Sequence, residues 1–187
     1  MLVSVVVATR NRPELLRSTL HALKAQTHQA LEVVVVDDGS SSATRAQYAP
    51  LWQELDDRFH LVVQGHDGQR GQGPSASRNQ AIQATHGELV SFCDDDDLWI
   101  DAEHLSRAVS AFGAHADLDL YISNQRAVYP DGSVREDWLP PLTTQWAAMP
   151  ALNTDRHRVS LAQLSQSGGF AHPNILVLRR KLLQAPG

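Results

Sequence analysis

Two runs of apolar residues near the N-terminus restrict the fold of this chain more than any other feature. Residues 2–8 (LVSVVVA) and residues 31–36 (LEVVVV) are almost continuously apolar and rich in valine. Continuous rather than alternating apolar character is typical of strands that are covered on both faces, as in a parallel sheet. We therefore predict two buried strands here, and shorter strands at residues 59–63, 89–93 and 174–178.

Helical segments separate these strands. Pro13 opens a segment in which Leu16, Leu20 and Leu23 recur on one face, which predicts a helix to about Gln26. Further helices are expected at about residues 43–55, 75–87 and 101–112. Strands that alternate with helices of about 10 to 15 residues indicate βαβ units. The predicted fold is therefore α/β, a Rossmann-like, mostly parallel sheet with flanking helices.

The pattern changes in the last third of the chain. Residues 118–129 and 134–139 flank the turn sequence Pro-Asp-Gly-Ser at 130–133, so we expect a β-hairpin there. The C-terminal part is thus predicted to be a mixed or antiparallel hairpin region. We expect one domain with two parts, residues 1–112 and residues 113–187.

Composition argues against several classes of protein. The 187 residues include 16 basic and 21 acidic ones, a net charge of −5, whereas nucleic-acid binders usually have a basic surplus. No apolar run approaches the roughly 18 residues of a membrane span, and the N-terminus lacks the features of a signal peptide. The single cysteine, Cys93, suits a reducing compartment and is expected to be a small buried hydrophobe. We predict a cytoplasmic protein, either free or held at the inner face of the membrane by other segments or partners.

Polar clusters follow three of the predicted strands. Residues 9–11 (Thr-Arg-Asn) follow the first strand, residues 37–40 (Asp-Asp-Gly-Ser) the second, and residues 94–97 (four aspartates) the fourth. The carboxyl ends of parallel strands lie along one edge of a sheet, and ligands bind in the crevice there. The three clusters are therefore expected to meet in one crevice.

The four consecutive carboxylates at residues 94–97 require an explanation. Two carboxylates about 6 Å apart repel each other by roughly 3 kcal/mol at an effective dielectric constant of about 20. Proteins tolerate such repulsion where a cation cancels it or where one group keeps a proton. Asp94 and Asp96 would point to the same side if strand geometry continued. This D-x-D pair is therefore predicted to bind Mg²⁺ or Mn²⁺, with substrate phosphate oxygens as further ligands.

Each cluster also has a purely structural interpretation. A solvated acidic turn would explain residues 94–97 without a ligand, whereas an EF-hand is disfavoured because its central Gly and terminal Glu are missing. Residues 9–11 and 37–40 could serve only as helix caps. Four other side chains could have either a structural role or a substrate contact: Arg78, Trp138, Trp146 and His172.

Residues 3–26, 33–42 and 73–99, in this order and spacing, resemble the family 2 glycosyltransferases of GT-A fold. The resemblance is tight over residues 1–112 and looser through residues 113–187. It implies metal-dependent transfer of a sugar, with inversion, from a nucleotide-diphosphate sugar to a glycan or other hydroxyl acceptor, as in polysaccharide biosynthesis. The donor is expected to be a UDP-sugar. The first part would bind the nucleotide-sugar, and the second would be an incomplete acceptor-side region.

The resemblance also implies roles for individual residues. Nucleotide-sugar contacts are implied for Ala8, Thr9, Arg10, Asp38, Arg78, Asp94 and Asp95, and metal ligation for Asp94 and Asp96. Asp38 is expected to bond the base, usually uracil, and Asp97 to support the turn. In this family the general base follows the last strand and helix, so we expect it beyond Gly187. Asp155 is a poor substitute, because the residues around it do not match the segment that carries the base in the family. The prediction is a truncated catalytic domain, and the alternative is a non-catalytic or truncated nucleotide-sugar-binding domain that lacks the base.

Overall fold

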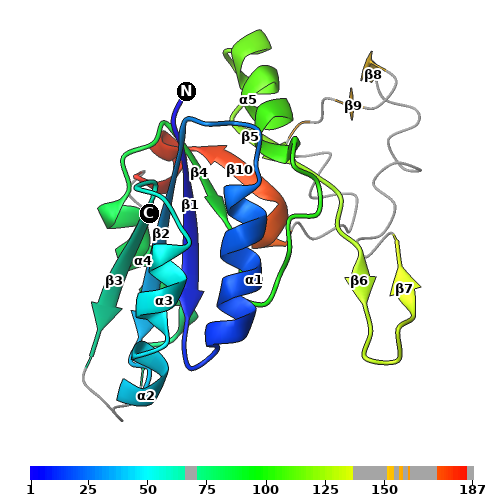
Figure 1. The fold of residues 1–187 in the computed structure, drawn as a ribbon. Helices are drawn as coiled ribbons and strands as arrows, with labels where there is room; N and C mark the ends of the chain where they lie inside the picture. Colours follow the sequence, from blue (N-terminus) through cyan, green and yellow to red (C-terminus); the bar gives the residue numbers. More distant parts are fainter. Residues whose placement is uncertain (66–70, 137–150, 154–155, 158–159, 161–171, 185–187) are drawn as a thin grey trace.

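A six-stranded sheet forms the centre of the computed structural model (Figure 1), with strand order β3-β2-β1-β4-β10-β5. The structure describes residues 1–65, 71–136, 151–153, 156–157, 160 and 172–184. The strands are β1 (Val3–Thr9), β2 (Leu31–Asp38), β3 (Phe59–Gln64), β4 (Leu89–Phe92), β5 (Leu120–Ile122) and β10 (Leu176–Arg179). β1 to β4 are mutually parallel, whereas β10 runs antiparallel to both of its neighbours. The predicted mostly parallel α/β sheet is confirmed.

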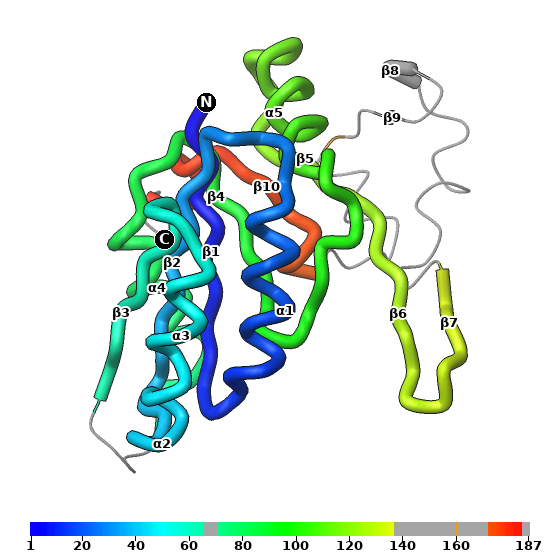
Figure 2. The backbone as a smooth tube through the Cα atoms, in the orientation of Figure 1, coloured from blue at the N-terminus to red at the C-terminus, as the bar shows by residue number. Residues whose placement is uncertain are grey.

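Helices cover both faces of this sheet (Figure 2). They are α1 (Pro13–Lys24), α2 (Ser42–Arg45), α3 (Tyr48–Gln53), α4 (Pro74–Ala84) and α5 (His104–Ala114). One apolar layer joins Val5 of β1 to side chains of α1, α3 and α5, and the other joins Val6 to Ala81 of α4. Successive side chains of a strand point to opposite faces, so β1 needs apolar residues at both odd and even positions. This is why its sequence is continuously apolar.

The single helix predicted at residues 43–55 is wrong, because the segment forms two short helices, α2 and α3. Pro50 lies in the first turn of α3, where its missing amide hydrogen is tolerated. In one continuous helix, Pro50 would leave the carbonyl of Ala46 without its donor and would clash with it. The chain therefore ends α2 at Arg45 and starts a new helix at Tyr48.

The strand predicted at residues 118–129 also divides in two. Leu120–Ile122 forms β5 and pairs with β10 in the central sheet, more than 50 residues further along the chain. β6 (Ala127–Val128) pairs with β7 (Val134–Arg135), and this short hairpin projects from the body of the molecule (Figure 1). The hairpin is confirmed but shorter than predicted, and residues 137–139 lie outside the described part.

The remaining elements are short. They are β8 (Ala151–Asn153) and β9 (Arg156–His157), which pair with each other, and the 3₁₀ helices η1 (Pro173–Ile175) and η2 (Arg180–Leu183). Among the described helices, none combines the length and the apolar character that crossing a membrane requires. Cys93 is buried, as predicted, and its burial raises the pKa of the thiol well above the ordinary value.

His104, the first residue of α5, should make the stability depend on pH. Its ring is 6% exposed and lies 4.6 Å from the ring of Trp99, and its Nε2 is buried without a partner among the described residues. Burial lowers the pKa of His104 from 6.5 to about 4. The unfolded chain therefore binds a proton at His104 more readily than the folded chain does. The contribution of the neutral ring to the free energy of unfolding is complete above pH 6.5 and decreases as the pH falls towards 4. We expect a loss of about 2 kcal/mol by pH 5.

Urea unfolding of the wild type and of His104→Gln between pH 7 and pH 5 measures this contribution. Other titrating groups are common to both proteins, so the difference between the two pH profiles isolates His104. Parallel profiles would contradict the prediction.

Candidate functional site

The acidic segment after β4 forms a tight turn rather than a continuation of the strand. β4 ends at Phe92, and the amide of Asp97 donates a hydrogen bond to the carbonyl of Asp94 at 3.1 Å. The hydroxyl of Thr19, on α1, lies 3.1 Å from the carbonyl oxygen of Asp95 and 2.9 Å from that of Asp97. The turn is therefore anchored to α1, and the strand-like alternation expected for Asp94 and Asp96 does not continue.

Side chains from the end of β1 contact this acidic turn, as the sequence predicted. The hydroxyl of Thr9 donates to Asp95 at 2.7 Å. Nη1 of Arg12 lies 3.1 Å from a carboxylate oxygen of Asp95 and 2.8 Å from one of Asp96. Burial raises the pKa of Asp95, although the hydrogen bond from Thr9 and the charge of Arg12 oppose the shift. Two segments more than 80 residues apart thus form one polar site.

The cluster after β2 lies beside the end of β1. Asp37 is fully buried and accepts hydrogen bonds from the amide of Ser40 at 3.1 Å and from Nε of Arg45 at 2.8 Å. Asn11 has a positive φ of 55°, and its side-chain oxygen accepts from the amide of Ser41 at 2.9 Å. The strand-end clusters of β1 and β2 are therefore linked directly.

Asp38 faces the segment that leads into α4. Its two carboxylate oxygens accept hydrogen bonds from the amides of Gln72 and Gly73, both at 2.8 Å. A Cβ atom on Gly71 would lie 2.6 Å from the carbonyl oxygen of Asp38, so this close approach requires glycine. Asp38 is 7% exposed and its carboxylate is held in a fixed orientation.

The other residues predicted to contact nucleotide have different environments. Ala8 is partly buried, and Arg10 is exposed. Arg78, on α4, forms an ion pair with Asp94. Whether these side chains contact a nucleotide remains a prediction. The predicted positions that lie outside the described residues are Trp138, Trp146, Asp155 and Gly187.

Asn174 is a site residue that sequence reasoning missed. It lies in η1, is 4% exposed, and its Nδ2 donates to Asp94 at 3.2 Å and to Asp97. Its carbonyl oxygen accepts from Nε1 of Trp99 at 3.2 Å. Arg12 and Thr19 were missed as well. A basic residue just after the first strand hints at Arg12, but no sequence pattern connects Asn174 with carboxylates 77 and 80 residues earlier.

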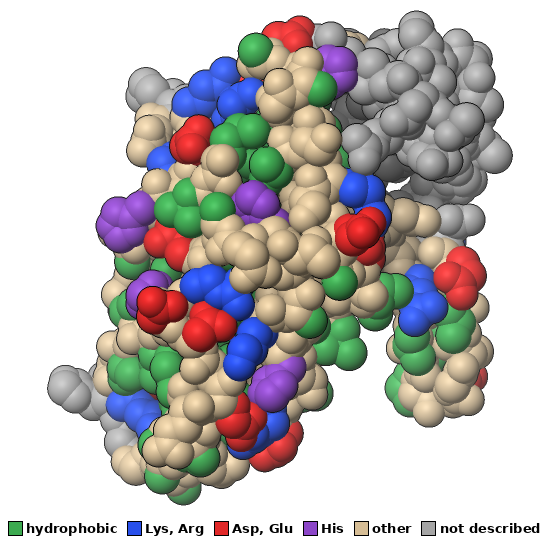
Figure 3. All heavy atoms as spheres, turned by 45° about the horizontal axis from the view of Figure 1, so that its top comes forward, with side chains coloured by type: hydrophobic (Ala, Val, Ile, Leu, Met, Phe, Trp, Pro, Cys, Tyr) green, Lys and Arg blue, Asp and Glu red, His purple; other side chains and the backbone are tan. Residues whose placement is uncertain are grey.

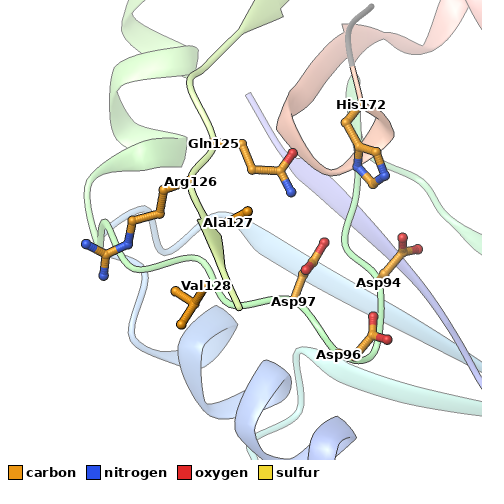
Figure 4. Close-up of a pocket in the computed structure, with 8 residues that line it drawn as sticks. All are labelled: Asp94, Asp96, Asp97, Gln125, Arg126, Ala127, Val128 and His172. Carbon is orange, nitrogen blue, oxygen red and sulfur yellow. The ribbon is translucent and has the colours of Figure 1, made fainter. Parts of the chain in front are cut away.

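The acidic turn borders an open pocket of about 350 Å³ (Figure 4). Its lining residues are Asp94, Asp96, Asp97, Gln125, Arg126, Ala127, Val128 and His172. Arg126 points away from the acidic side chains. Burial raises the pKa of Asp97, with a smaller contribution from the charges of Asp94 and Asp96, and the hydrogen bond from Asn174 opposes it. The wall formed by the turn thus consists of the acidic side chains of Asp94, Asp96 and Asp97.

Oxygen and nitrogen donors in this pocket are close enough to share a cation. Asp94, Asp97 and His172 each offer one atom, and these three atoms lie within 4.8 Å of one another. Asp96 is exposed and paired with Arg12. On the face drawn in Figure 3, by contrast, acidic and basic side chains are interspersed. Among its described residues, that face therefore shows no gathering of carboxylates comparable with the four consecutive aspartates after β4.

Comparison with known proteins identifies the family. A sequence profile described as "Glycosyl transferase family 2" matches residues 4–185. This chain belongs to glycosyltransferase family 2. EpsH of Bacillus subtilis is 33% identical to this family 2 chain over 129 residues, which cover 69% of the chain and 35% of EpsH. The GalNAc(5)-diNAcBac-PP-undecaprenol β-1,3-glucosyltransferase of Campylobacter jejuni is 37% identical over 108 residues, which cover 57% of the chain and 32% of that enzyme.

A solved structure extends the similarity to nearly the whole family 2 chain. The crystal structure of S. aureus TarS in complex with UDP matches 98% of the chain with a TM-score of 0.66 and 25% sequence identity. The predicted GT-A fold is thereby confirmed. The match covers 48% of the TarS chain. The chain therefore spans about half or less of the length of these relatives.

Proposed function

We propose that this chain binds a nucleotide-diphosphate sugar, together with Mg²⁺ or Mn²⁺, and serves sugar transfer to a glycan or other hydroxyl acceptor. The observation that carries the proposal is that the three strand-end clusters adjoin one another: Thr9 donates to Asp95 in the acidic turn, and the amide of Asn11 donates to the hydroxyl of Ser40 after β2. Membership of glycosyltransferase family 2 supports the reaction class. The similarity to TarS, which binds UDP, favours a UDP-sugar as donor.

The residues of the acidic turn fit a divalent cation. Carboxylate oxygens are the ligands that Mg²⁺ and Mn²⁺ prefer, and an imidazole nitrogen also suits Mn²⁺. Without a cation, the crowded charges of the turn form ion pairs with Arg12 and Arg78 and accept hydrogen bonds from Thr9 and Asn174. Asp94, with Asp96 or Asp97, would hold the ion. When bound, the ion supplies charge neutralisation for the diphosphate leaving group.

The rest of the donor site is proposed to bind the nucleoside. Each carboxylate oxygen of Asp38 already accepts one amide hydrogen bond and keeps a second lone pair, so it can accept the N3–H of uracil. Ala8, Thr9 and Arg10 would border the base and ribose. In this proposal the donor occupies residues 1–112 and the acceptor lies against residues 113–187.

Transfer would proceed by a single displacement. An acceptor hydroxyl attacks the anomeric carbon with inversion, its proton passes to a carboxylate base, and the nucleoside diphosphate leaves. We assign no described residue as that base. A cytoplasmic location, where nucleotide-sugars would be the donors, is part of the same proposal.

A thermal-shift screen of UDP-, GDP- and dTDP-sugars, each with Mn²⁺ and with EDTA, tests the donor proposal. A ligand at about one hundred times its Kd stabilises a protein by about 2.7 kcal/mol. For a domain of this size, that corresponds to an increase in Tm of roughly 5 to 10 °C. We expect such an increase for a UDP-sugar with Mn²⁺ and a much smaller one with EDTA. The absence of a shift with every donor would refute the proposal.

Activity requires a separate measurement. Release of UDP in the presence of acceptor, measured on the full-length protein, distinguishes a transferase from a non-catalytic nucleotide-sugar-binding domain. The second alternative predicts donor binding with no acceptor-dependent release.

A further inference from the structure

We infer that the cation is ligated by Asp94, Asp97 and His172, so that the η1 segment supplies one side of the metal site. The inference rests on the proposed function and deepens it, because it names the ligands of the same ion. The D-x-D pattern alone pairs Asp94 with Asp96. The two ligand sets therefore share Asp94 and differ in the remaining residues.

The shape of the turn is the first argument for this set. The hydrogen bond from the amide of Asp97 to the carbonyl of Asp94 closes a four-residue turn, and one side-chain oxygen of each residue lies within 4.8 Å of the other. Figure 4 shows both carboxylates and the imidazole of His172 directed into one space. Three donor atoms within 4.8 Å of one another can bind one ion after small side-chain rotations.

The second argument is the environment of Asp96. Its carboxylate accepts from Nη1 of Arg12 at 2.8 Å, and the same nitrogen lies 3.1 Å from Asp95. Arg12 is thus a cationic partner of Asp96, as Arg78 is of Asp94, so the difference between the two ligand sets lies in Asp96 and Asp97. For Asp97, by contrast, the described side-chain hydrogen bond comes from the neutral amide of Asn174.

The third argument is the buried amide of Asn174, which is 4% exposed. Its Nδ2 contacts both Asp94 and Asp97, while its Oδ1 is buried with no partner among the described residues. The two carboxylates therefore hold Nδ2 of Asn174 by their charge, although Oδ1 of the same amide is left without a described partner. Arg78 forms an ion pair with Asp94, whereas the described side-chain hydrogen bond of Asp97 comes from this neutral amide, which cannot cancel a negative charge.

The position of His172 is compatible with ligation. Nδ1 of His172 accepts from the amide of Asn174 at 3.4 Å, which is long for a hydrogen bond and therefore weak. Turning the imidazole ring so that one of its nitrogens faces the carboxylates therefore costs little free energy. Pro173 follows His172 directly and begins η1, so the backbone that carries the ring is restricted.

Mn²⁺ binding without any nucleotide, measured by calorimetry and by the electron paramagnetic resonance signal of free Mn²⁺, tests the inference. We expect His172→Ala to weaken Mn²⁺ binding at least about tenfold. His60→Ala is the matched control, because His60 is exposed on β3, which β2 and β1 separate from β4, and this variant should bind Mn²⁺ as the wild type does. Melting curves in EDTA confirm that each variant is folded.

The aspartates provide the second comparison. We expect Asp97→Asn to weaken Mn²⁺ binding more than Asp96→Asn does. Wild-type Mn²⁺ affinity in His172→Ala, or the reverse order of the two aspartate variants, would overturn the inference. If donor binding by the wild type still requires Mn²⁺ in either case, only the ligand set is wrong and the proposed function stands. If the wild type binds neither Mn²⁺ nor donor, both fail.

Discussion

Asp94→Asn should abolish metal-dependent binding of the nucleotide-sugar, with an increase in Kd of at least about 100-fold in the presence of Mn²⁺, or about 2.7 kcal/mol. Asp94 belongs to both possible ligand sets, so the expectation does not depend on whether Asp96 or Asp97 is its companion. Asparagine keeps the size of the side chain but removes the charge, and a neutral amide oxygen is a weaker ligand for a divalent cation. Calorimetric titration of a UDP-sugar with Mn²⁺, and with EDTA, measures the effect.

The fold should be almost unaffected by this substitution. Asp94 forms an ion pair with Arg78 whose side chains are 26% and 24% exposed, and such a pair contributes about 0 to 1 kcal/mol. The Tm in EDTA should therefore change by no more than a few degrees. Glu14→Gln removes one negative charge from the exposed first turn of α1 and serves as the control. Unchanged metal-dependent binding in Asp94→Asn would rule out the acidic turn as the metal site.

The sheet was largely predictable because its strands are buried on both faces. Residues 2–8 and 31–36 carry apolar side chains at odd and even positions, which few other structures require. The predictions failed where a local feature or a long-range pairing competed with the pattern. Pro50 divides a helix whose apolar residues suggest one continuous element. Residues 120–122 pair with a strand more than 50 positions away, which a turn sequence at 130–133 cannot indicate.

The candidate site was predictable to the level of segments rather than of contacts. The strand-end rule correctly brings Thr9 to the acidic turn and residues 37–40 beside residues 9–11, because β2 and β4 both flank β1 in the sheet. The rule does not give the conformation of the turn itself. Strand-like alternation favours Asp94 with Asp96, whereas the turn places Asp94 beside Asp97. The contribution of Asn174 depends on β10 inserting next to β4, and that insertion leaves no local signal in the sequence.

Gly87→Ala should destabilise the protein by at least about 3 kcal/mol, because Gly87 lies against the backbone at the start of β1. A Cβ atom there would lie 2.7 Å from the amide nitrogen of Ser4 and 2.8 Å from the carbonyl oxygen of Leu2. These are backbone atoms of a buried strand and cannot move aside easily. Inserting a methyl group into such packing costs about 1 to 3 kcal/mol, and here hydrogen bonds are lost as well.

The hydrogen bonds at risk belong to a buried polar cluster around Glu32. The amide of Gly87 donates to the hydroxyl of Ser4 and to Glu32, both at 2.8 Å. Burial acts to raise the pKa of Glu32, but the hydrogen bonds from Ser4, His86 and Gly87 outweigh it and hold the pKa below the ordinary value. Displacing Gly87 would therefore leave a buried carboxylate with fewer donors, which adds to the steric cost.

Gly113→Ala is the matched control, because the same methyl group is added where there is room for it. Gly113 lies exposed in α5, and its Cβ would meet only Cε of Met1, at 3.8 Å. Alanine in a helix is favoured over glycine by about 0.5 to 1 kcal/mol, so this variant should be slightly more stable than the wild type. Urea unfolding at pH 7 should therefore give midpoints that move in opposite directions. Equal midpoints for the two variants would mean that the packing described around Gly87 is incorrect.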